Sequence, residues 1–194
     1  MTSQFTDLVT WRGDSYALVG VEGDGLFSLE DHGLSVVATS TANWRGCVVE
    51  YEIQADQLRV QNLRQVGLPT HERDDPLRVV GIKADEDSMG GHKFVGLDLD
   101  LAFTGRILLA REQASGLPFR HMGLPPAWRF EEVWDLRLEA GRVVEATDLS
   151  ERVRQLREAI LAGDAPDPSG DPDDDGWIER QFELDIERSL GPHR

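Results

Sequence analysis

Short segments in which apolar and polar residues alternate run through most of the chain, and they constrain its fold more than any other feature. In the segment 94–101, three leucines alternate with Asp98 and Asp100. Successive side chains of a strand point to opposite faces of a sheet, so this pattern is typical of a half-buried strand. Similar apolar segments, separated by turns rich in Gly and Asp, predict further strands at 16–21, 26–29, 35–39, 47–53, 58–63, 77–82, 106–110, 132–138 and 142–145.

These strands predict a mainly β fold. We expect an antiparallel meander of about nine or ten strands that forms a closed or nearly closed barrel, because closure removes exposed strand edges. Two of the expected hairpins follow similar sequences, Ala42–Arg45 and Ala127–Arg129, each preceded by a Gly-Leu step. This similarity raises the hypothesis of a pseudo-twofold duplication.

A helix is expected at 148–162, where apolar residues recur with a 3.6-residue period. Asp148 is a suitable N-cap, with Glu151 three residues later, and Gly163 is placed to end the helix. This helix would close a β-rich domain at 1–163. An acidic linker rich in Pro, Gly and Asp follows at 164–176, and an amphipathic C-terminal helix is expected at 177–190, with apolar residues four apart at Ile178, Phe182, Ile186 and Leu190.

The chain is strongly acidic, with 36 Asp and Glu residues against 20 Lys and Arg and a formal net charge of -16. Such a chain repels the phosphates of nucleic acids, so a basic protein partner is expected instead. The alternative is that the charge only maintains solubility. If a basic partner binds, the residues expected to contact it are Asp98, Asp100, Asp171, Asp173, Asp174, Asp175 and Trp177.

The acidic linker also resembles part of a calcium-binding loop. Asp171, Asp173 and Asp175 occupy the alternating ligand positions of an EF-hand loop, and Gly176 occupies the position of its sharp turn. The closing position, where a bidentate Glu is needed, is Phe182. We therefore expect no cofactor or metal, and calcium binding by the three aspartates stays an alternative.

A second candidate site is made of Arg120, His121 and Trp128. His121 lies between apolar residues, but the sequence near it contains no nucleophile motif, which favours a structural role. If the barrel enclosed a sizeable cavity, these three residues would be the candidates for a small-molecule site or for an enzyme site in the barrel mouth.

The phrases Thr41–Gly46 and Arg120–Arg129 resemble those of an uncharacterised family of bacterial β-rich proteins. The resemblance covers residues 16–148. It implies a bacterial origin and a single β-rich body, and it transfers no activity.

The remaining features predict a cytoplasmic protein. The single Cys47 excludes an intrachain disulfide, which suits a reducing compartment. The first seven residues do not resemble a signal peptide, and no stretch is apolar for the roughly 18 residues that a membrane helix needs. Taken together, these features predict a non-enzymatic protein that neutralises a basic partner, in its most concrete form a bacterial immunity or antitoxin-type inhibitor.

Overall fold

The computed structural model describes residues 3–69, 78–117, 123–167, 184–186 and 190. In these residues the chain is mainly β, as the alternating segments predict. The strands are β1 Leu8–Trp11, β2 Asp14–Asp24, β3 Val48–Gln54, β4 Gln57–Val66, β5 Arg78–Val79, β6 Ile82–Lys83, β7 Asp85–Glu86, β8 His92–Asp100, β9 Thr104–Gln113, β10 Phe130–Glu139 and β11 Arg142–Asp148. The helical segments are the 3-10 turns η1 Glu30–His32 and η3 Ala127–Arg129 and the helix α1 Ser150–Ala162.

Nine of the strands form one sheet in the order β11-β10-β9-β2-β1-β3-β4-β8-β7, and β5 and β6 form a separate hairpin. The sheet is not the antiparallel meander expected from the sequence. β1 pairs with β2 antiparallel but with β3 parallel, because the long connection at 25–47 returns the chain to the far side of β1. This arrangement places the N-terminal strand in the middle of the sheet, between the hairpins β3–β4 and β10–β11.

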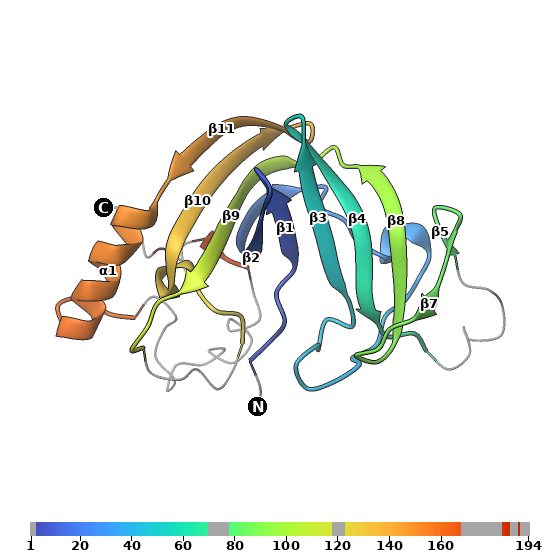
Figure 1. Ribbon diagram of the computed structural model, residues 1–194, viewed down its shortest axis with the longest axis horizontal. Coiled ribbons are helices and arrows are strands. Elements are labelled where there is room, and N and C mark those ends of the chain that lie inside the picture. Colours follow the sequence, from blue (N-terminus) through green and yellow to red (C-terminus); the bar gives the residue numbers. More distant parts are fainter. Residues whose placement is uncertain (1–2, 70–77, 118–122, 168–183, 187–189, 191–194) are drawn as a thin grey trace.

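One end of the sheet, β11, meets β4 at the tips of these two hairpins. β11 pairs with β4 at Arg142 and Gln57, so seven strands form a ring of hydrogen bonds. Close to this point the amide of Leu58 donates to the carbonyl of Gly141 at 2.8 Å, and the Gly141 amide donates to the carbonyl of Phe103 at 2.7 Å. Figure 1 shows the strongly bent sheet and the two tips side by side at the top of the view.

The apolar side chains form two clusters on opposite faces of the sheet. The larger one contains inward side chains from β1, β2, β3, β4, β8, β9 and β10. The smaller one lies under α1, where Val153 packs with residues of β9 and β10 and with Ile186 and Leu190 of the C-terminal segment. Consecutive residues such as Leu108 and Leu109 of β9 belong to different clusters, so this part of the sheet is buried on both faces.

Several strands expected from the sequence are absent or altered. Residues 26–29 and 35–39 form no strand within the described structure, since β2 continues to Asp24 and η1 follows. The segment 77–82 contributes to the short hairpin β5–β6, whose turn contains Val80 and Gly81. The apolar residues of 26–29 and 35–39 are instead used as a cover over the larger cluster, where Leu29 is buried and Leu26, Phe27 and Val36 pack against it.

The helix α1 lies within the expected range, and Gly163 ends it with a φ of 80°. Its N-terminus differs from the expected capping box. The Asp148 carboxylate accepts a hydrogen bond from the Ser150 amide at 2.8 Å, whereas Glu151 pairs with Arg154 at 2.6 Å. Most of the expected helix at 177–190 lies outside the described residues.

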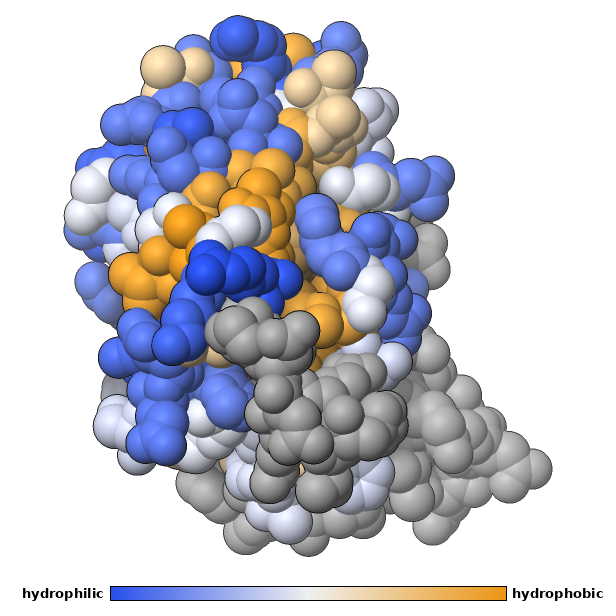
Figure 2. All heavy atoms as spheres, turned by 90° about the vertical axis from the view of Figure 1, so that its right-hand side faces the viewer, coloured by the Kyte–Doolittle hydropathy of each residue, from blue (hydrophilic) through white to orange (hydrophobic). Residues whose placement is uncertain are grey.

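Hydrophobic residues reach the surface on the side of the molecule where β5, β7 and β8 lie, as Figure 2 shows. Exposed apolar side chains in this region are Val80, Met89 and Val95. Among the described residues, no helix is long and apolar enough to cross a membrane.

Candidate functional site

A polar groove crosses four neighbouring strands on the outer face of the sheet. Its volume is about 380 Å³. Glu50 and Glu52 of β3 line it because they alternate with the inward-facing Val49, Tyr51 and Ile53. The complete lining, here called the acidic groove, consists of Leu8, Thr10, Ser15, Glu50, Tyr51, Glu52, Gln61 and Asn62.

The strand register brings these residues together. Leu8 and Thr10 of β1 lie opposite Glu50 and Glu52 of β3, across the single parallel pair in the sheet. On the other side of β3, the register with β4 shifts between Glu50 and Tyr51, which leaves Gln61 as an extra residue in β4. An extra residue of this kind bends a strand and redirects its side chains, so Gln61 and its neighbour Asn62 both reach the groove.

The two glutamates of the groove differ in their contacts. The Asn62 side-chain amide donates to the Glu50 carboxylate at 2.7 Å, and the Arg64 guanidinium lies 3.5 Å from it. The Glu52 carboxylate has no hydrogen bond or ion pair within the part of the chain that the structure describes. Glu52 is therefore a negative charge that faces the groove without an ion-pair partner among the described residues, because Arg59, which lies opposite it in β4, pairs with Asp98 and Asp100.

Asp98 and Asp100, predicted to contact a partner, continue the acidic surface beyond the groove. Their side chains are 57% and 67% exposed, and both carboxylates lie 2.6 Å from the Arg59 guanidinium. Asp98 also accepts a hydrogen bond at 3.2 Å from Gln61, which lines the groove. The leucines between and beside these aspartates face the core, so the alternation predicted for β8 is confirmed.

The outer surface is acidic even after this pairing, because one arginine often serves two carboxylates. Arg59 pairs with Asp98 and Asp100, and Arg64 pairs with Glu50 and Asp87. The same arrangement recurs at Arg106, Arg111, Arg137 and Arg154. Each such group keeps one net negative charge.

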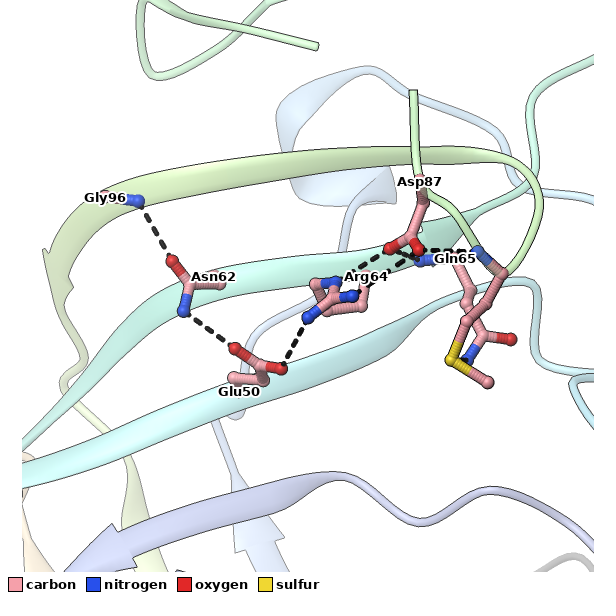
Figure 3. A network of polar contacts seen from close by, with 7 residues as sticks. Glu50, Asn62, Arg64, Gln65, Asp87 and Gly96 are labelled. Atoms are coloured by element: carbon pink, nitrogen blue, oxygen red, sulfur yellow. Dashed lines mark hydrogen bonds and ion pairs between the residues drawn. The ribbon is translucent and has the colours of Figure 1, made fainter. Parts of the chain in front are cut away.

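Asp87, in the turn between β7 and β8, anchors this turn to β4. Figure 3 shows its carboxylate facing Arg64 and the backbone of the neighbouring loop. Its side chain is fully buried and lies 2.7 Å from the Arg64 guanidinium. It also accepts hydrogen bonds from the amides of Gln65 at 3.2 Å and Met89 at 3.0 Å. Asp87 was not predicted from the sequence as a buried anchor.

The hydrogen bond from Arg64, with those from Met89 and Gln65, lowers the pKa of Asp87 from 3.8 to about 2 despite its burial. A lowered folded-state pKa stabilises the protein above the unfolded pKa, and this contribution is lost as the pH falls towards 2. We expect Asp87→Asn to lower the free energy of unfolding at pH 7 by about 2 kcal/mol. The difference from the wild-type chain should shrink between about pH 4 and pH 2.

Urea unfolding across this pH range measures the effect, with Asp98→Asn as the matched control. Because Asp98 is exposed, its substitution should change stability by less than about 0.5 kcal/mol at every pH. A difference between Asp87→Asn and wild type that persists unchanged at pH 2 would contradict the assignment.

The other residues predicted from the sequence do not join this surface within the described structure. Arg120 and His121 lie outside the described residues, as do Trp177 and the four linker aspartates Asp171, Asp173, Asp174 and Asp175. Trp128 is 2% exposed and belongs to the cluster under α1, so it is a core residue. No group of His, Cys, Asp or Glu among the described residues could hold a metal ion, and the linker aspartates of the calcium alternative lie outside these residues.

Glu50 and Glu52 were not predicted as site residues, although the sequence shows the pattern that places them on the outer face. They alternate with apolar residues in the same way as the aspartates of β8. Their neighbours in the groove could not be identified from the sequence because β1 was not predicted as a strand.

The comparisons with known proteins return no relatives: no family model, curated protein or solved structure matches the chain.

Proposed function

We propose that this chain is a non-enzymatic binding protein that neutralises a basic protein partner through the outer face of β1, β3, β4 and β8. In its most concrete form it is an immunity or antitoxin-type inhibitor, which covers the cations that its target uses to bind phosphates. The observation that carries the proposal is the Glu52 carboxylate, which faces the groove and makes no hydrogen bond or ion pair within the described residues.

A lysine or arginine side chain is a suitable occupant of the acidic groove. Its charge would lie beside Glu52, and Glu50 and the side chains of Gln61 and Asn62 supply further hydrogen-bond acceptors. The exposed Asp98 and Asp100 beside the groove extend the negative field, which accelerates the encounter with a cationic surface.

The same face offers apolar contact area. Leu8 in the groove is 36% exposed, and Val95 of β8, which lies opposite Asn62, is 56% exposed. A protein interface combines such an apolar contact with a polar rim. We propose that the ring of seven strands, joined at Arg142 and Gln57, is a closed barrel in which large side chains such as Phe94 and Phe103 are fully buried.

The proposal is tested with a defined cationic probe, an amidated hexa-arginine peptide, by titration calorimetry at about 0.1 M ionic strength, where the Debye length is about 10 Å. The double variant Glu52→Gln/Asp98→Asn removes two charges from the proposed surface. We expect it to weaken binding about tenfold, which corresponds to roughly 1.4 kcal/mol.

The control variant Glu112→Gln/Asp31→Asn removes the same charge from two exposed positions that do not line the groove. It should change the affinity by less than about twofold, since charges beyond a Debye length are screened. Equal losses in the two variants would show that only net charge attracts the peptide, and the proposed surface would be rejected.

A further inference from the structure

A second pocket, separate from the acidic groove, lies on the inner side of β3. Its volume is about 220 Å³. One wall is formed by the connection between β2 and β3, and the other by inward side chains of β3. The apolar lining consists of Leu26, Phe27, Leu29, Val36, Cys47, Val49 and Leu184, and the polar lining of Asp7, Ser28, Glu30, Arg45 and Tyr51.

Two ionised side chains of the pocket, Arg45 and Asp7, are paired with each other. The Arg45 guanidinium forms two hydrogen bonds to the Asp7 carboxylate, at 2.8 Å and 2.9 Å. Asp7 also accepts a hydrogen bond from the Val49 amide at 2.8 Å. Burial, together with the charge of Asp7, raises the pKa of the Cys47 thiol to about 12, so it is uncharged at neutral pH. The inner surface of the pocket therefore carries no net charge from these groups.

Tyr51 supplies a polar group without a partner. Its side chain is 2% exposed and points inward with its neighbours on β3. Burial, and next the nearby Asp7 carboxylate, raise the pKa of Tyr51, with Arg45 and Cys47 as further neighbours. The hydroxyl thus faces groups that line the pocket, but it makes no hydrogen bond within the part of the chain that the structure describes. The hydroxyl is therefore open to the pocket, where it can donate a hydrogen bond to a ligand oxygen.

We infer that this pocket binds a small, uncharged, mainly apolar molecule whose single carbonyl or hydroxyl oxygen accepts a hydrogen bond from Tyr51. The size fits one ring with a short substituent, since a cavity of about 150 Å³ holds benzene. An anion is disfavoured because Arg45 is already engaged by Asp7 and because Glu30 adds negative charge to the lining. A cation is disfavoured because the Asp7 carboxylate already accepts three hydrogen bonds.

Three probes of nearly equal size separate these requirements in an NMR titration of the full chain. Acetophenone carries a carbonyl oxygen, α-methylstyrene has the same shape without the oxygen, and benzoate carries a charge. We expect saturable binding of acetophenone with shifts at the amides of Cys47, Val49 and Tyr51. α-Methylstyrene should bind about fivefold more weakly, as expected for the loss of one hydrogen bond, and benzoate should not bind at the same concentrations.

Three variants make the assignment specific. Tyr51→Phe should reduce the affinity for acetophenone to that for α-methylstyrene and leave the latter unchanged. Val36→Trp, which fills the pocket from the connection, should abolish binding of both, with circular dichroism as the check that it folds. Glu52→Gln, in the groove on the opposite face of β3, should leave acetophenone binding unaffected, so this test is independent of the proposed protein partner.

Equal affinities of the wild-type chain for acetophenone and α-methylstyrene would overturn the inference, as would tighter binding of benzoate. Absence of saturable binding by all three probes would also overturn it. If a folded Val36→Trp still binds acetophenone, the binding site lies elsewhere and the pocket is not the ligand site.

Discussion

Replacement of Gly141 by alanine is expected to lower the free energy of unfolding by at least about 3 kcal/mol, because two penalties combine at this residue. Gly141 has a φ of 82°, which favours glycine. A Cβ atom placed there would lie only 1.8 Å from the carbonyl oxygen of Leu101 and 2.5 Å from the side-chain nitrogen of Gln57. The tips of the hairpins β3–β4 and β10–β11 would have to separate, and the hydrogen bonds that join the ring would be broken.

Gly81 provides the matched control for this prediction. Its φ of 80° is nearly the same, but a Cβ atom there would meet nothing within 4 Å. Gly81→Ala therefore isolates the backbone penalty and should cost only about 1 kcal/mol. Chemical denaturation of the two variants measures the difference. Equal losses would show that the contact between the hairpin tips contributes nothing to stability.

Replacement of Asp7 by alanine should cost about 3 kcal/mol, the lower end of the range for breaking a buried ion pair. The Asp7 side chain is 4% exposed, while Arg45 keeps 34% of its side chain exposed and can regain some water. Asp7 joins the segment before β1 to the start of β3, because it binds both Arg45 and the amide of Val49. Its loss would leave that amide and the guanidinium without their acceptor.

Two further variants test this explanation by chemical denaturation at pH 7. Asp100→Ala removes an exposed carboxylate and should cost less than about 1 kcal/mol. Asp7→Asn/Arg45→Met removes both charges and should be more stable than Asp7→Ala, because no buried guanidinium is left unpaired. If Asp7→Ala and Asp100→Ala cost the same, burial does not strengthen the pair, and the explanation is wrong.

The sequence predicts those parts of the fold that depend on local patterns. The hairpins β3–β4 and β10–β11 have clear alternation and short turns, and α1 has a regular apolar stripe ended by Gly163. Pairings between strands that are distant in the sequence were not predictable. β1 is only four residues long, and its parallel pairing with β3 follows from the path of the connection at 25–47, which no local pattern shows.

The wrong strand predictions have one physical cause. A buried position selects an apolar residue whatever the backbone conformation is. Leu26 and Phe27 indicated a strand, but they pack against the core from an irregular segment. The tryptophans show that residue type alone does not determine burial. Trp44 is 56% exposed, whereas Trp11 is 5% exposed and contacts Trp134.

The sequence predicts that the candidate site consists of solvent-facing carboxylates, but it does not predict which strands bring them together. Alternation alone shows that Asp98 and Asp100 face solvent, as do Glu50 and Glu52. That both pairs belong to one surface depends on β4, which lies between β3 and β8 and carries Arg59 between the carboxylates. A long-range pairing of this kind is encoded in the packing of the whole sheet rather than in any single segment.

The most direct test of the proposed function is an NMR titration of the wild-type chain with the hexa-arginine peptide. The account predicts that the largest amide shifts fall in β1, β3, β4 and β8, around Glu52, and that they disappear at high salt. Shifts spread evenly over the acidic surface, or centred on α1 or on the linker at 164–176, would contradict it.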